Sequence, residues 1–167
     1  KVIFGRMTSG TGQKEPCPSV VLGPIQNNVV VSLAVYPGID EQPEDGTNYI
    51  VHNCPVANVP IQRWCNILIS VYGRTLDLYL DGKLVRTCVL PGVAKIDANA
   101  PVYITPNGGF SGWTSNFQYW PDSTDPQKAW NIYKAGYGGS LLGSIFGKYT
   151  VKISLMEGDT EDSSWTI

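Results

Sequence analysis

The amino-acid sequence predicts an all-β protein in which two antiparallel sheets pack face to face, with one short helix near residues 125–135. Apolar and polar residues alternate along several segments, which is the period of a half-buried strand. The 167 residues include 18 glycines and 12 prolines, which divide the chain into short pieces joined by turns. Only one segment has a helical pattern. This combination is typical of a β-sandwich.

The predicted strands share alternating apolar residues, and they cover residues 2–4, 29–36, 64–72, 76–80, 84–90, 102–105, 115–120 and 149–156. Asp81 and Gly82 separate two of these strands. Because an Asp-Gly pair adopts positive φ at low cost, we expect a tight hairpin there.

The helical segment has a start signal, an apolar stripe and a stop signal. Asp125 is a good N-cap, Pro126 suits the first turn and Gly136 suits the end. The stripe consists of Ala129, Trp130, Ile132 and Tyr133. We therefore expect a helix of about three turns.

Length and charge restrict the domain count and the partner class. A chain of 167 residues fits one domain over residues 1–167. The net charge is −2 and the basic residues are dispersed, so we expect no nucleic-acid partner. No apolar run reaches the ~18 residues of a membrane span. Since the chain begins at Lys1 without methionine, we expect a missing upstream segment, in which a signal or membrane anchor would lie.

The four cysteines contain no C-x-x-C pair, so we expect no thiolate metal site. Cys17 and Cys54 lie near prolines in loop-like sequence, and a disulfide between them is as plausible as two free thiols. Cys65 and Cys88 fall within apolar strands, where we expect them to act as small hydrophobic residues.

The sequence resembles a known family over residues 60–139. A tryptophan, a strand, a turn and an L-Y-x-D-G-K-like hairpin follow one another in residues 60–64, 67–71, 73–74 and 78–85, and residues 110–112, 117–120 and 132–136 agree with the closing strand and helix. This order resembles the laminin-G-like branch of the concanavalin A-like lectin and glucanase superfamily. The resemblance implies a jelly-roll sandwich of two curved sheets, a fold that hosts several functions.

Three positions depart from the pattern of this family. Asn66 stands where many members have histidine, Thr114 where an apolar residue is usual, and Asn116 where an acid is common. The sequence is also similar to those of laminin-G-like proteins from large DNA viruses of algae and amoebae, some of which carry an amino-terminal membrane anchor.

Each candidate chemical site can also be explained by a purely structural role of its residues. Glu157, Asp159 and Glu161 match the spacing of glucanase carboxylates, but Gly158 and Thr160 provide no core anchor between them, so we expect a solvated acidic turn.

We expect a structural role for the single histidine, His52. Calcium is possible near the loop acids, but they form no ligand motif, and we expect no cofactor. These acids are Asp40, Glu41, Glu44 and Asp45.

The composition is rich in aromatic residues, with 18 in all. We expect Phe117, Tyr119, Trp64 and Trp130 to pack in the core. The binding candidates are aromatic residues at loops or strand ends, where a ring can stack on a sugar or anchor a protein partner: Trp113, Trp120 and Tyr137.

These observations favour a recognition or structural domain without enzymatic activity. By resemblance, we expect it in a virion or on a membrane surface, where it contacts other virion or surface proteins, or glycans. A carbohydrate-binding lectin module is the alternative, and a glycoside hydrolase of the glucanase type is a more remote one.

Overall fold

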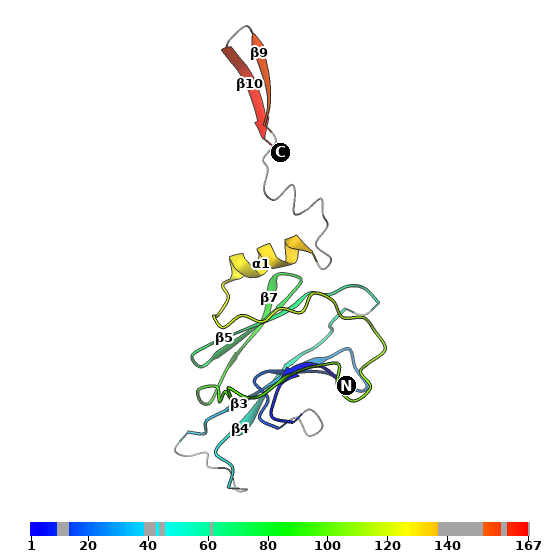
Figure 1. Ribbon diagram of the computed structural model, residues 1–167, viewed down its shortest axis with the longest axis vertical. Coiled ribbons are helices and arrows are strands. Elements are labelled where there is room, and N and C mark those ends of the chain that lie inside the picture. Colours follow the sequence, from blue (N-terminus) through cyan, green and yellow to red (C-terminus); the bar gives the residue numbers. More distant parts are fainter. Residues whose placement is uncertain are drawn as a thin grey trace.

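The computed structural model describes residues 1–9, 14–38, 43, 46–60, 62–136, 152–157 and 160–166. One sheet has five strands in the order β4-β3-β2-β1-β8, and a second has three in the order β5-β6-β7, all antiparallel (Figure 1). The strands of the first sheet are β1 (Val2–Arg6), β2 (Ser19–Leu22), β3 (Val29–Val35), β4 (Ile50–Val56) and β8 (Val102–Ile104). Those of the second are β5 (Ile67–Tyr72), β6 (Thr75–Leu80) and β7 (Lys83–Val89).

The main core lies between these two sheets, which confirms the predicted β-sandwich. The alternating residues of β3 that were predicted to share a face are fully buried in it: Val29, Val31, Leu33 and Val35. Leu76 and Leu78 of β6 pack against them from the opposite sheet. The period-two pattern therefore marks the inner faces.

A helix forms a third layer outside the three-stranded sheet (Figure 1). This helix, α1 (Pro126–Ala135), begins at the predicted cap, where the backbone N–H of Lys128 donates to the Asp125 carboxylate at 2.7 Å. Ala129 is buried against Leu68 and Tyr79 on the outer face of the sheet. The helix gives these outward-facing residues a second, smaller core.

A buried hydrogen-bond pair fixes the chain just before α1. The hydroxyl of Ser70 on β5 donates to the carbonyl of Thr124 at 3.1 Å, and the Thr124 N–H donates back to that hydroxyl at 2.8 Å. One serine thus satisfies two backbone groups that would otherwise be buried without partners.

The predicted hairpin forms between β6 and β7, with φ of 49° at Asp81 and 72° at Gly82. Its tip lies under α1. A Cβ on Gly82 would stand 2.9 Å from side-chain atoms of both Trp130 and Tyr133. Glycine is needed here for its backbone angle and for the close approach of the helix.

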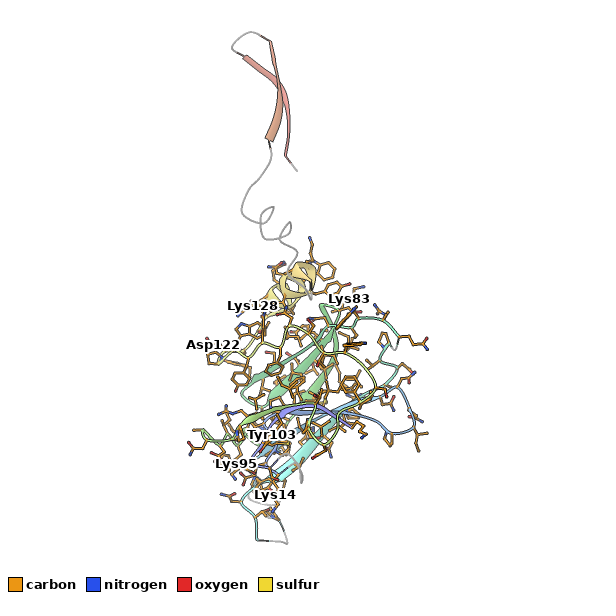
Figure 2. The ribbon with its side chains drawn as sticks, turned by 45° about the vertical axis from the view of Figure 1, so that its right-hand side comes forward. Lys14, Lys83, Lys95, Tyr103, Asp122 and Lys128 are labelled. Atoms are coloured by element: carbon orange, nitrogen blue, oxygen red, sulfur yellow. A yellow bond between two sulfur atoms is a disulfide. The ribbon has the colours of Figure 1, made fainter. Side chains whose placement is uncertain are left out.

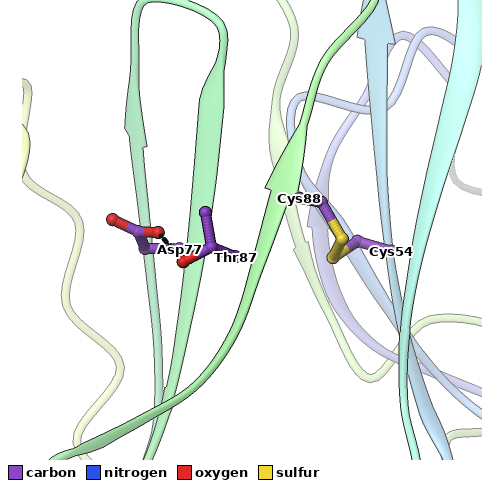
Figure 3. The surroundings of a disulfide bond; sticks show 4 residues. All are labelled: Cys54, Asp77, Thr87 and Cys88. Carbon is purple, nitrogen blue, oxygen red and sulfur yellow. Dashed lines mark hydrogen bonds between the residues drawn. A yellow bond between two sulfur atoms is a disulfide. The ribbon is translucent and has the colours of Figure 1, made fainter.

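The disulfide differs from the predicted one. Cys54 on β4 bonds to Cys88 on β7, with 6.1 Å between the two Cα atoms, so the bridge crosses the core and joins the two sheets (Figure 3). Cys17 is a buried free thiol. The pairing of Cys17 with Cys54 was therefore wrong, as was the role of Cys88 as a simple hydrophobic residue. Which cysteines meet depends on which strands face each other, and that is a tertiary property.

Several local predictions also need correction. Residues 115–120 form no strand. Phe117 instead contacts Phe4 edge to face at 5.2 Å, and the Tyr119 hydroxyl accepts from the Arg6 guanidinium at 3.0 Å. Both aromatics stay at least 41% exposed, so they dock on β1 rather than fill the core. Trp64 also stays exposed, contrary to expectation.

Two more strands, β9 (Lys152–Glu157) and β10 (Thr160–Thr166), form an antiparallel hairpin. The predicted strand at 149–156 overlaps β9, whereas β10 was not predicted. In the described ranges, no helix is both long and apolar enough to cross a membrane.

Candidate functional site

A cleft of about 630 Å³ opens where the loop after β4, the β6–β7 hairpin and α1 meet. Val56, Leu80 and Val85 contribute its apolar surface. Trp130 and Tyr133 contribute aromatic rings whose centroids lie 5.5 Å apart. These two side chains remain 38% and 36% exposed. Trp130 is therefore shared between packing on the hairpin tip and the wall of the cleft, rather than being a core residue.

Strand β7 borders this cleft with an open edge. It pairs with β6 on one side, and no described strand pairs with its other side. All of its side chains except that of Cys88 are exposed, including Leu84 and Val89. An unpaired strand edge with exposed apolar side chains is a template for pairing with another chain segment.

The charge of the cleft is positive, although the whole chain has a net charge of −2. Arg63, Lys83 and Arg86 line it, with Asp81 as the single carboxylate among the lining residues. Lys83 lies at the end of the sandwich that α1 covers, opposite Lys14 and Lys95 (Figure 2). The cleft therefore has an excess of cationic groups for an anionic ligand.

Asp81 neutralises one of the three cations and also holds the local geometry together. One carboxylate oxygen accepts from the Arg63 guanidinium at 2.7 Å, and the other accepts from the Asn66 N–H at 2.9 Å. These bonds position Arg63 beside the hairpin tip. Lys83 and Arg86 remain as exposed cations.

The thiol next to this carboxylate is held in its neutral form. Burial, together with the nearby Asp81 charge, raises the pKa of Cys65 to about 11. Burial also raises the pKa of the Cys17 thiol. Neither cysteine is therefore a thiolate nucleophile near neutral pH.

The two predicted binding residues that the structure describes, Trp113 and Trp120, lie in different surroundings. Trp113 is 87% exposed on a loop, whereas Trp120 packs against the Leu68–Tyr79 cluster with the Lys128 ammonium 5.8 Å from its ring centre. Neither lines the cleft. Tyr137 lies outside the described residues, so its predicted role is untested.

The candidate acids are only partly described. Asp40, Glu41, Glu44, Asp45 and Asp159 lie outside the described residues. Among all the residues that the structure describes, no group of three or more His, Cys, Asp or Glu side chains has the arrangement of a metal site.

The two candidate glucanase glutamates fall on neighbouring strands of the C-terminal hairpin. The backbone register opposes Glu157 to Thr160 and Glu161 to Met156, and the glutamate side chains lie outside the description. The single histidine, His52, is partly buried on β4 and opposes Leu33 of β3.

The sequence interpretation missed the residues that form the cleft. Arg63, Lys83 and Arg86 come from a loop and a strand, and Trp130 and Tyr133 come from the helix. One local signal was available. The strand after Asp81 and Gly82 carries two cations, and charged side chains are typical of an exposed edge strand.

No protein-family model and no curated protein matches this sequence. Among solved structures, a likeness exists to a crystal structure of an S-layer domain-containing protein, residues 221–444, from Clostridium thermocellum. The TM-score is 0.34 and the identity 8%, over 80% of this chain and 62% of the other. This chain thus spans less than two thirds of that structure.

Proposed function

We propose that this domain is a recognition module without catalytic activity, and that it binds an anionic segment of a partner protein through the cleft beside β7. The observation that carries the proposal is the composition of the cleft. Two exposed cations, an arginine–aspartate ion pair, two partly exposed aromatic rings and several apolar side chains line it, next to a strand edge that has no described partner.

The groups in the cleft are suited to binding. Guanidinium and ammonium groups donate charge-assisted hydrogen bonds to carboxylates, and the aromatic rings provide rigid apolar contact area. The thiol beside the cleft is kept protonated by its surroundings. Binding would bury a preformed surface, without making or breaking covalent bonds.

The Cys54–Cys88 disulfide supports display outside the cell or on a particle. Structural disulfides persist in oxidising environments and are rare in reducing compartments. The resemblance to viral laminin-G-like proteins extends this proposal to a virion or a membrane surface, with other virion or surface proteins as the partners.

A lectin function is the second candidate, and the Trp130–Tyr133 pair favours it. Aromatic faces in a cleft can stack on sugar rings, and the surrounding cations would select an acidic glycan. The glucanase function has no such support in the described residues.

The test compares an acidic polypeptide with an acidic glycan. We expect the full chain to bind immobilised poly-L-glutamate, and we expect Arg86→Glu to weaken this binding by about tenfold or more, since the charge of a contact group is reversed. Rising salt concentration should also weaken it.

Lys14→Glu is the charge-matched control, because Lys14 is exposed at the end of the sandwich opposite Lys83 (Figure 2). Equal losses for Lys14→Glu and Arg86→Glu would remove the cleft from the proposal. Binding to hyaluronan but not to poly-L-glutamate would favour the lectin.

A further inference from the structure

A β-bulge in β7 brings two cations onto one face of the second sheet. Lys83 opposes Leu80 of β6. Arg86 opposes Leu78, and the register shifts by one residue between these two pairs. Leu78 and Leu80 both pack on the core between the sheets, because residues two apart on a strand share a face. The extra residue on β7, Val85, therefore gives Lys83 and Arg86 the same face, although they are three residues apart in the sequence.

The free edge of β7 also presents backbone groups to a further strand. The N–H of Leu90 donates to the carbonyl of Arg74 at 2.8 Å, one step beyond the end of the β6–β7 ladder. Bonded and unbonded pairs alternate in an antiparallel ladder. Counting back from this pair, Arg86 directs its backbone groups to β6. Thr87 and Val89 direct theirs to the opposite side, where no described strand pairs.

The same alternation holds on the other side of the bulge. The N–H of Asp81 donates to the carbonyl of Asn66 at 2.9 Å, at the end of the β5–β6 ladder. Tyr79, two residues earlier, therefore also directs its backbone groups to β5. Leu84 opposes Tyr79, so its own groups point to the free edge. Leu84 and Thr87 thus offer hydrogen bonds on either side of the bulge.

The charges along this edge select what can pair with it. β7 carries two cations and no acid, so the same strand of a second copy would bring like charges together, which destabilises a sheet. A strand that carries acids gains ion pairs instead. Since alternate residues of an ordinary strand share a face, two acids separated by one residue would meet Arg86 and Lys83 together. The residue between them would lie on the other face, beside the half-exposed Leu84.

We propose that the anionic partner segment binds as an added antiparallel strand on the free edge of β7, with two acids at alternate positions opposite Arg86 and Lys83. The inference rests on the proposed function and adds the conformation, the direction and the acid spacing of the segment. Every strand pair in the two sheets is antiparallel, and this pairing is slightly more stable than the parallel one. In this direction the residue before the first acid opposes Thr87, and the residue between the acids opposes Leu84.

Fluorescence anisotropy of labelled synthetic peptides with the full chain tests the acid spacing. The reference peptide is Ser-Val-Thr-Val-Glu-Val-Glu-Ser with both ends capped. Its isomer Ser-Val-Thr-Val-Val-Glu-Glu-Ser has the same composition and charge. We expect the isomer to bind about threefold more weakly or worse, because one acid moves to the opposite face of the strand. Equal affinities would contradict the spacing.

A single N-methyl group separates strand pairing from charge attraction. On the valine before the first glutamate, it removes the N–H that would bond to Thr87, and we expect the affinity to fall about fivefold or more. On the first glutamate, it replaces an N–H that would point away from β7, so the affinity should stay within about twofold. Both measurements use the unaltered protein. The opposite order of the two effects would overturn the antiparallel register.

Charge reversal locates the acids on the strand. Arg86→Glu should weaken binding of the reference peptide about tenfold. Replacing the first glutamate of the peptide by lysine should restore the affinity to within about threefold of the original pair, because opposite charges again face each other. Replacing the second glutamate should not, because that lysine would meet Lys83. Restoration by the second replacement alone would refute the proposed direction.

The two proposals fail in different ways. Poly-L-glutamate binding that Arg86→Glu weakens, together with equal affinities for the two N-methylated peptides, would refute only the strand pairing. Losses that Lys14→Glu reproduces, or no binding of poly-L-glutamate and of any peptide by the unaltered protein, would refute the proposed function.

Discussion

Removing the bridge between the sheets should cost a large part of the stability of this domain. Cys54 and Cys88 are separated by 34 residues and join β4 to β7 across the core. In the chain-entropy description, a loop of this length restricts the unfolded state by about 4 kcal/mol at 25 °C. The combined change Cys54→Ala and Cys88→Ala should therefore lower the free energy of unfolding by about that amount.

Urea unfolding followed by tryptophan fluorescence measures this loss. With a denaturant slope of about 2 kcal/mol per molar, the midpoint should fall by about 2 M urea. Dithiothreitol should bring the parent protein to the same midpoint. Cys65→Ala is the matched control, because Cys65 is a free thiol, and it should shift the free energy of unfolding by less than about 1.5 kcal/mol.

Two results would contradict a stabilising Cys54–Cys88 bridge. A double variant within about 1 kcal/mol of the parent would mean that the cross-link does not restrict the unfolded chain as the entropy relation requires. If Cys17→Ala reproduced the loss, the bond would involve Cys17 instead of Cys88.

Three further changes test local features. Gly82→Ala should lower the free energy of unfolding by about 2–3 kcal/mol, because the new Cβ meets α1 and the backbone has φ of 72°. Ser70→Ala should cost about 1–3 kcal/mol, because it leaves a buried N–H and a buried carbonyl of Thr124 without their partner. Alkylation of Cys65 by iodoacetamide should rise with pH and reach half its maximum rate near pH 11, against 9.0 for an ordinary thiol, since burial disfavours the thiolate.

Each of these changes has a control in the same chain. Gly73→Ala places a methyl group in open space at φ of 57°, so it isolates the backbone contribution and should cost less than Gly82→Ala. Thr87→Ala removes an exposed hydrogen bond to Asp77 (Figure 3) and should cost under about 1 kcal/mol. Cysteine reactivity is measured in a Cys17→Ala background. Equal costs for the two glycines, or rapid alkylation at pH 8, would contradict the packing described.

The two-strand hairpin of β6 and β7 and the helix α1 were predictable because their signals act over a few residues. The Asp81–Gly82 turn depends on its own backbone angles, and the Asp125 cap depends on an N–H three residues away. The inner faces of β3 and β6 were predictable for a similar reason, since burial of one sheet face imposes alternation on the strand itself.

Other strands depend on their neighbours. β4 contains Pro55 and two polar residues, so its sequence has little strand character, yet it pairs with β3 over its full length. Residues 115–120 show the opposite case. Their aromatic alternation resembles a strand, but Phe117 and Tyr119 dock on side chains of β1 without joining a ladder. Contacts between distant segments override the local pattern at both places, through strand pairing in β4 and through side-chain docking at residues 115–120.

The all-β class, the inner faces of the strands, the β6–β7 hairpin and the helix follow from local patterns in the sequence. Tertiary structure alone decided that Cys54 meets Cys88, that α1 covers the second sheet, and that Arg63, Lys83 and Arg86 gather beside one open strand edge. The reason is physical. Backbone angles and one-sided burial are properties of consecutive residues, whereas a disulfide or a cleft requires that residues far apart in the chain be brought together, and only the packing of the sheets and the helix fixes which ones meet.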